Sequence, residues 1–443
     1  MSENVLLQRS SKIIDSGEHD PQVDPINPLT NELHELNEQV AVITSFARVV
    51  AVKTNAGIVL FDTSTGVATE KVLSELRSWS QDPIHTVFYT HGHLDHVSGS
   101  GTVRQHAIDR GEPAPRFVGH QNIARRWARY RRTNQFNLDI NSRQNNHLAN
   151  PNFTIGPNAE ARARGVNTFV PEDVVEPDTT FTDVFTENIG GLTFSVRHVL
   201  AETDDHSWIH IPELKTVIGA DLISWNFPNA GNPQKIQRYP AEWAQALRDI
   251  IAVEPELYVP MHGLPITGHQ RITTVLGDTA EALETIVDQV VDAMNQGHSL
   301  PRIVEQLRLP TELMAKPWLR PRYDDPEFMI RTVWRSYAGW WDGEPVTLKP
   351  ASRTDVARAL AEMVSNGLTL KAAAEKAVAD GQLDVATELA TYAAAATPED
   401  PEVHRTLAEV YATRAESEPS TMCKGVFVDA AERASAKATE LGG

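Results

Sequence analysis

Cysteine is almost missing from the chain, because Cys423 is the only one among 443 residues. A single thiol excludes an internal disulfide and a cysteine-rich zinc site. The chain also has no apolar run of membrane-spanning length, and its N-terminus has no basic start followed by an apolar core. We therefore expect a cytoplasmic protein that does not enter a membrane.

Basic residues are also few relative to acidic residues. The chain has 40 Lys and Arg against 59 Asp and Glu, which gives a net charge of -19. Because the phosphates of nucleic acids demand a basic surface, we expect no nucleic-acid partner. A small anionic substrate is compatible with this charge, since a metal ion and one or two arginines can dominate locally.

Length and residue patterns predict two domains. At 443 residues, with 41% hydrophobic residues, the chain exceeds one typical domain and can fill ordinary cores. Residues 1–39 are mostly polar and are predicted to form an irregular N-terminal arm. Strand and helix patterns alternate over residues 40–297. Residues 298–443 are predicted to be almost entirely helical, with alanine-rich amphipathic segments at a spacing similar to a tetratricopeptide stack.

A cluster of histidines follows the short apolar run Val87–Tyr89. That run is typical of a buried strand, and the glycine between the first two histidines lets the chain turn off its end. His91 and His93 can face one metal ion, whereas the adjacent Asp95 and His96 can reach a second ion. Imidazole and carboxylate ligands suit zinc or iron better than calcium or magnesium. A solvated histidine-rich loop is the alternative, but four potential ligands in six residues argue against it.

The hexapeptide His91-Gly92-His93-Leu94-Asp95-His96 resembles the signature of the metallo-β-lactamase superfamily. The resemblance implies a fold of the α/β class, an αββα sandwich, as the catalytic domain over residues 40–297. It also implies a mono- or dinuclear metal site that activates water for hydrolysis, and we expect two zinc ions per chain. The motif gives almost no information about the substrate.

The resemblance also implies the remaining metal ligands. Asp221 ends a predicted strand and suits a bridging carboxylate, and His262 suits the last histidine; their ordinary alternatives are a capping carboxylate and a turn histidine. Where most superfamily members have a histidine after a Pro-Gly pair, this chain has Glu202. The implied set is His91, His93 and Glu202 on one ion, Asp95, His96 and His262 on the other, and Asp221 between them.

Glu202 is the residue that narrows the family. The alternative is that Glu202 is a surface carboxylate and that His206 or His198 ligates instead, but the position in the motif favours Glu202. Glutamate at this place is a mark of the alkylsulfatase branch of the superfamily. The sequence is therefore similar to alkylsulfatases in its predicted site.

The helical part of the chain resembles the same branch. Residues 295–310 and 334–345, with Gly-Trp-Trp-Asp-Gly-Glu-Pro as the most specific part, resemble the helical dimerisation domain of those enzymes. The resemblance implies that residues 298–443 form this domain and that the protein is a homodimer. Many relatives continue into a sterol-carrier-like C-terminal domain, which we expect this chain to be too short to hold, and many have a secretion signal and a glutamate where Asp221 stands.

The resemblance implies hydrolysis of an alkyl sulfate ester to an alcohol and inorganic sulfate, with Asp95 and Asp221 holding the metal-activated water. Hydrolysis of a lactone, a thioester or a phosphoester on the same fold is one alternative. A non-catalytic binding protein that uses its helices as an interaction platform is another. The presence of all the implied ligands argues against a protein without activity.

Side chains that could bind the substrate come from two regions. In this acidic chain, residues 121–165 carry several arginines and are predicted to form either a surface helix and loop or a lid that supplies a cation. The segment 140–144 also resembles a family element near the active site. The candidates for binding sulfate are Arg238, Arg143, Asn141, Asn226 and Asn229, and the candidates for lining an apolar channel are Trp225, Phe227 and Trp243.

Overall fold

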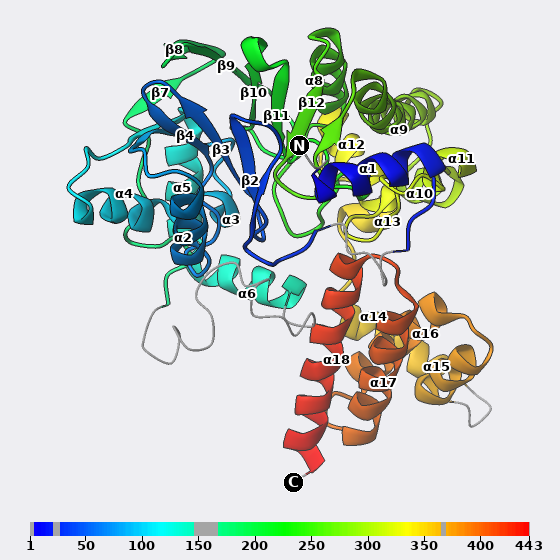
Figure 1. Cartoon of the computed structure of the whole chain (residues 1–443). Coiled ribbons are helices and arrows are strands. Elements are labelled where there is room, and N and C mark those ends of the chain that lie inside the picture. The colour runs from blue at the N-terminus through cyan, green and yellow to red at the C-terminus, as the bar shows by residue number, and fades with distance from the viewer. Residues whose placement is uncertain (1–3, 21–26, 146–166, 365–368, 443) are drawn as a thin grey trace. The chain divides into compact units, whose positions relative to one another are not determined.

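The chain forms two compact units (Figure 1), described by a computed structural model over residues 4–20, 27–145, 167–364 and 369–442. The first unit comprises Met1–Asp139 and Asn150–Ala338, and the second comprises Ile140–Ala149 and Gly339–Gly443. The part of the predicted lid at residues 146–165 lies outside the described residues.

The first unit contains two β-sheets. One has seven strands in the order β1-β2-β3-β4-β5-β6-β7, and the other has six in the order β13-β12-β11-β10-β9-β8. The strands of the first sheet are β1 (Leu33–Glu35), β2 (Val40–Ile43), β3 (Val49–Thr54), β4 (Gly57–Phe61), β5 (Ile84–Phe88), β6 (Arg116–His120) and β7 (Thr179–Phe181). Those of the second are β8 (Val184–Ile189), β9 (Leu192–His198), β10 (Ser207–Ile211), β11 (Thr216–Ala220), β12 (Leu257–Pro260) and β13 (Ile266–Thr267).

Strand β3 shows how the sequence builds the layers. Because side chains alternate between the two faces of a strand, Val50 and Val52 point into the core between the sheets. Val49 and Ala51 point the other way, into a core that the first sheet shares with its covering helices. An almost continuous apolar run therefore fills two layers at once.

Helices cover the outer face of each sheet (Figure 1). On the first sheet these are α2 (Thr69–Trp79), α4 (Ser100–Asp109) and α5 (Asn122–Arg132), which bury Val72, Val103 and Trp127 in its outer core. On the second sheet they are α8 (Pro240–Ala252) and α9 (His269–Asn295). The predicted αββα sandwich is confirmed.

The N-terminal arm is more regular than the sequence predicts. Residues Val5–Ser16 form helix α1, whose N-terminus is capped by the side chain of Asn4, and Leu6 and Ile13 are buried in the core. Strand β1 pairs with β2. The prediction of an irregular arm is wrong for these segments, because two apolar anchors on a short polar helix give a weak pattern.

Residues 298–338 pack with the first unit. They form α10 (Leu300–Gln306), α11 (Thr311–Met314) and α12 (Pro326–Tyr337), and Ile303, Leu319 and Met329 join the core that also contains α9. The compact units thus divide after Ala338, whereas the sequence prediction starts the dimerisation domain at residue 298.

The second unit is helical, as predicted. Its core is built mainly from small side chains such as Ala374, Ala386 and Ala390, which let neighbouring helices approach closely. Its helices are α13 (Pro345–Leu348), α14 (Arg353–Met363), α15 (Leu370–Ala379), α16 (Leu383–Ala396), α17 (Pro401–Ser417) and α18 (Thr421–Gly442), and the unit also takes the C-terminal part of α6 (Asn134–Asn145). No helix within the described ranges is long and apolar enough to cross a membrane.

Asp324 ties the loop between β11 and α8 to the start of α12. Its buried carboxylate accepts hydrogen bonds from the backbone N–H groups of Gly231 (2.7 Å) and Asp325 (2.8 Å). Glycine is required at 231, because a Cβ there would lie 2.2 Å from the backbone nitrogen of Met329. The loop that follows Asp221 is therefore anchored at a buried acid.

This anchor predicts a pH-dependent stability. Burial raises the pKa of Asp324 from 3.8 to about 7. Because the folded-state pKa is raised in this way, the protonated side chain contributes its full stabilisation of the fold below about pH 4. This contribution is lost as the pH rises through about 7. Because an amide stays neutral, the melting temperature of Asp324→Asn should rise relative to wild type between about pH 4 and 7. Asp249→Asn, on the exposed face of α8, should show no such trend; a constant difference for Asp324→Asn would contradict the prediction.

Candidate metal centre

The first four predicted ligands follow strand β5. His91 and His93 lie in the loop after this strand, and Asp95 and His96 lie in the one-turn helix α3 (Leu94–Val97). Strand β5 is parallel to both its neighbours, β4 and β6, so its carboxyl end lies at one edge of the sheet. His91 and His96 are fully buried there.

The other three predicted ligands come from the second sheet. Glu202 lies in the loop between β9 and β10, Asp221 directly follows β11, and His262 lies just after β12. Because β11 and β12 are parallel neighbours, Asp221 and His262 lie at the same edge of this sheet. The fold thus brings together side chains that are far apart in the sequence.

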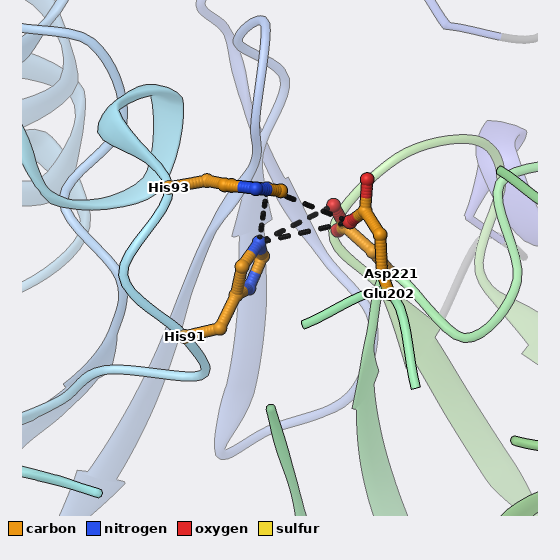
Figure 2. Close-up of side chains that lie close together, drawn as sticks. All are labelled: His91, His93, Glu202 and Asp221. Atoms are coloured by element: carbon orange, nitrogen blue, oxygen red, sulfur yellow. Dashed lines mark hydrogen bonds and ion pairs between the residues drawn. The ribbon is translucent and has the colours of Figure 1, made fainter. Parts of the chain in front are cut away.

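The structure gathers four of these side chains into a first group: His91, His93, Glu202 and Asp221 (Figure 2). His91 Nε2 lies 2.9 Å from His93 Nδ1 and 3.7 Å from Asp221 Oδ2. Glu202 Oε2 lies 3.8 Å from His91 Nε2 and 3.6 Å from His93 Nδ1. These atoms surround a space that one cation can fill.

A second group contains Asp95, His96 and His262. Asp95 Oδ2 lies 3.5 Å from His96 Nε2 and 3.3 Å from His262 Nε2. Asp221 Oδ2 also lies 3.3 Å from His96 Nε2 and 3.5 Å from His262 Nε2. Asp221 therefore borders both groups, which is the place of a bridging carboxylate.

Three buried atoms of these groups point to cations. Within the described part of the chain, His96 Nε2, Glu202 Oε2 and Asp221 Oδ1 have no hydrogen-bond partner. Burial alone would raise the pKa of Glu202, but Arg238 and His93 outweigh it and lower this pKa well below its usual value. Buried polar atoms are costly when they are left without partners, and this set of nitrogen and oxygen donors fits metal ions that accept such ligands.

Asp62 orients His96, a role that the sequence analysis missed. Its Oδ2 lies 2.7 Å from His96 Nδ1, and the carboxylate also accepts hydrogen bonds from the N–H and the hydroxyl of Thr90. A hydrogen bond at Nδ1 leaves Nε2 directed at the second group. The available signal was the position of Asp62 at the end of a strand next to β5.

Arg238, predicted as a sulfate ligand, forms an ion pair with Glu202. Its Nη1 lies 2.5 Å from Glu202 Oε1, and Asn229 Nδ2 donates to the same oxygen at 2.5 Å. Glu202 Oε1 is thus engaged, and Oε2 is left for the first group. Asn226 donates instead to the backbone carbonyl of Ser224.

The histidine alternatives to Glu202 lie outside both groups. His206 Nε2 accepts the backbone N–H of Asp221 at 3.3 Å, and its ring stacks on His91. Burial lowers the pKa of His206 to about 4, as expected for a neutral structural imidazole. His198 stacks on His120 and lies 3.1 Å from the carbonyl oxygen of Asp204.

The remaining predicted substrate residues belong to the second unit or to the core of the first unit. Arg143 and Asn141 belong to the second unit, where Arg143 Nε donates to Asp429 at 3.2 Å. Trp225, Phe227 and Trp243 are buried in the core, so the prediction that they line a channel is not supported.

Two residues near the site were not predicted. Lys235 interacts electrostatically with Glu202 and Asp95, and burial lowers its pKa to about 8. Tyr323 also lies near Glu202, and burial raises its pKa. Lys235 lies in the loop between β11 and α8, and Tyr323 lies just before α12. Asp324 joins these two segments, and this contact becomes visible only in the folded structure.

Known proteins similar to this chain are alkylsulfatases. It is 29% identical to a linear primary-alkylsulfatase of Pseudomonas sp. over 76% of this chain and 64% of that protein. It is 25% identical to an alkyl/aryl-sulfatase of Saccharomyces cerevisiae, covering 74% and 52%, and 24% identical to an (R)-specific secondary-alkylsulfatase of Pseudomonas sp., covering 80% and 54%. The chain thus spans about half to two thirds of the length of these relatives.

A solved structure shares the fold. The stereoselective inverting sec-alkylsulfatase of Pseudomonas sp. matches with a TM-score of 0.78 at 18% identity, covering 91% of this chain and 66% of that chain. A double mutant of a sec-alkylsulfatase matches with the same TM-score of 0.78, at 17% identity, covering 97% and 67%. At this identity the likeness concerns the fold alone.

The geometry predicts different results for Glu202 and His206. Glu202→Ala removes a carboxylate from the first group and should weaken metal binding at one position by at least about tenfold. His206→Gln keeps an acceptor for the N–H of Asp221 and should leave metal content unchanged. Elemental analysis and chelator competition on both variants provide the measurement. The opposite pattern would identify His206 as the ligand.

Two family models divide the chain. Residues 44–262 match the metallo-beta-lactamase superfamily, and residues 300–437 match alkyl sulfatase dimerisation. The first range contains all seven side chains of the two groups, with glutamate at position 202. Together with the alkylsulfatase relatives, these matches show that the chain belongs to the alkylsulfatase family of the metallo-β-lactamase superfamily.

Proposed function

We propose that the protein hydrolyses alkyl sulfate esters to an alcohol and inorganic sulfate. The observation that carries the proposal is Glu202, which lies among His91, His93 and Asp221 and is held there by Arg238. The relatives bear the names of alkylsulfatases acting on primary and secondary esters. A cytoplasmic location is part of the proposal and accords with the single cysteine.

Two zinc ions per chain are the proposed cofactor. One would be held by His91, His93 and Glu202, the other by Asp95, His96 and His262, with Asp221 shared between them. When bound, such ions lower the pKa of water toward neutrality and attract the anionic head of the ester.

Carboxylates of the chain would manage the proton of the attacking water. Burial raises the pKa of Asp95, but His96 and His262 outweigh it and lower this pKa well below the usual value, so Asp95 is ionised. Asp221 Oδ1 is buried and has no hydrogen-bond partner among the described residues. Asp95 and Asp221 are therefore proposed as the catalytic carboxylates, with the proton passing to Asp221 Oδ1.

Cations near Glu202 would bind the sulfate group. Lys235 is our first candidate, because it interacts with Glu202 and Asp95 and carries the compact charge that suits an oxyanion. Arg238 would contribute mainly by holding Glu202. Asn226, Arg143 and Asn141 stay proposed substrate residues.

A substrate panel tests the function. Dodecyl sulfate or a branched secondary alkyl sulfate should release sulfate, and a chelator should abolish this release until zinc is restored. Lactones, thioesters and phosphate monoesters should be poor substrates. Water labelled with oxygen-18 would show which bond breaks, by labelling the sulfate or the alcohol. Efficient turnover of the controls without any sulfate release would reject the proposal and leave only the superfamily.

We also propose that the second unit forms a homodimer. Trp340, Val346 and Met363 are more than two-thirds exposed, at 71%, 74% and 76%, and large apolar side chains that are exposed are candidates for an interface with a partner. The match of residues 300–437 to alkyl sulfatase dimerisation supports this assignment.

Charge at these exposed apolar positions should separate the dimer. The double variant Trp340→Glu, Val346→Glu should behave as a monomer at micromolar concentration, whereas wild type should have the mass of two chains by light scattering. Val184→Glu, on an exposed position of β8 in the first unit, serves as the control and should remain dimeric. A monomeric wild type would contradict the proposal.

A further inference from the structure

Gly92, between His91 and His93, is fixed through both of its backbone polar groups. Its N–H donates to Asp205 Oδ2 at 3.1 Å, and its carbonyl accepts from Trp127 Nε1 at 2.9 Å. A Cβ at this position would lie 2.8 Å from Asp205 Oδ2, so a larger residue would have to displace this carboxylate. The backbone that presents both histidines therefore cannot shift without breaking these contacts.

Arg126 in turn fixes Asp205. Its Nε donates to Asp205 Oδ2 at 2.9 Å, and its Nη2 pairs with Asp204, so that the planar guanidinium grips two adjacent carboxylates. Arg126 is 2% exposed and Asp205 is fully buried. Burial raises the pKa of Asp205, but Arg126 outweighs it and lowers this pKa to about 2, so both partners carry charge.

These contacts join the two sheets beside one half of the metal centre. Arg126 and Trp127 lie on α5 over the first sheet, whereas Asp205 lies in the loop of the second sheet that carries Glu202. Asn122 of α5 adds a hydrogen bond to the carbonyl of Asp204 at 3.0 Å. Within the described part of the chain, the hydrogen bonds of Arg126, Trp127 and Asp205 do not include Asp95, His96 or His262.

We propose that Arg126, Trp127 and Asp205 form a clamp of positioning residues that sets the metal affinity of the first group without setting that of the second. The clamp fixes the separation between His91 and His93 on one sheet and Glu202 on the other. The second group depends instead on Asp62, which holds His96. The inference rests on the proposed metal centre, but not on the identity of the substrate.

Zinc titration of the metal-free full-length chain tests the clamp, with a chromophoric chelator as competitor. Cobalt absorption spectra provide a second readout of ligand geometry. Arg126→Met and Asp205→Asn should weaken one of the two binding steps about 10- to 100-fold and leave the other within about twofold. Trp127→Phe removes the N–H donor together with part of the ring but keeps the ion pairs of Arg126, and it should give a smaller loss at the same step. Arg126→Lys keeps one charge and should restore part of the affinity.

Arg77→Met is the matched control. Arg77 forms another nearly buried ion pair, to Glu112 at 2.9 Å, and also contacts His106 and the carbonyl of Asp82. Its loss should lower the melting temperature but leave both zinc affinities and the cobalt spectrum unchanged.

Three results would overturn the clamp: equal losses at both steps, no loss at either, or the same loss in Arg77→Met. A wild type that binds no metal would reject the metal centre and the clamp together. A wild type that binds two ions but releases no sulfate would reject only the proposed substrate, and the selective loss in the clamp variants would still support this inference.

Discussion

Negative charge buried where two sheets meet is the constraint on which the rest of the structure depends. Asp62, Asp95, Glu202 and Asp221 are each less than one-tenth exposed, and buried charge is costly unless it is paired. In this chain the buried negative charge is compensated by imidazole side chains and by Arg238, and the arrangement of these groups fits cations. The parallel strands of the two sheets therefore end at the same edge of the sandwich. There, carboxylates from both sheets lie close to the same histidines.

Compensation alone would not place the atoms, and neighbouring residues complete the geometry. Asp62 engages one nitrogen of His96, while Arg238 and Asn229 engage one oxygen of Glu202. In each case the second atom of the same group is left facing the centre. The supporting residue thus orients the ligand side chain by hydrogen bonding to the atom that does not face the metal centre. Supporting residues usually orient metal ligands in this way.

The resemblance of the histidine motif to the metallo-β-lactamase superfamily allowed the sandwich and the set of potential ligands to be predicted, because four of the ligands lie in that compact motif and the other three occupy positions that the resemblance implies. It did not reveal the supporting contacts. Asp62 acts on His96, Arg126 on Asp205, and Arg238 on Glu202, and each pair is distant in the chain. Residue type alone does not tell a cation that binds substrate from one that holds a metal ligand, and Arg238 is such a case. Trp225 and Trp243 show a similar ambiguity, since aromatic residues in a loop can equally well fill a core.

Because α10 to α12 pack in the first unit, the boundary of the family match for dimerisation does not coincide with the boundary between the two compact units. The family match for dimerisation begins at residue 300, yet Ile303, Leu319 and Met329 belong to the core of the first unit, and Asp324 holds the loop that carries Asn229 and Arg238. A segment classed with subunit association thus also supports the residues around Glu202. Recombination between relatives at the family boundary would separate side chains that have to match, so these two parts of the chain can be expected to evolve together rather than as exchangeable modules.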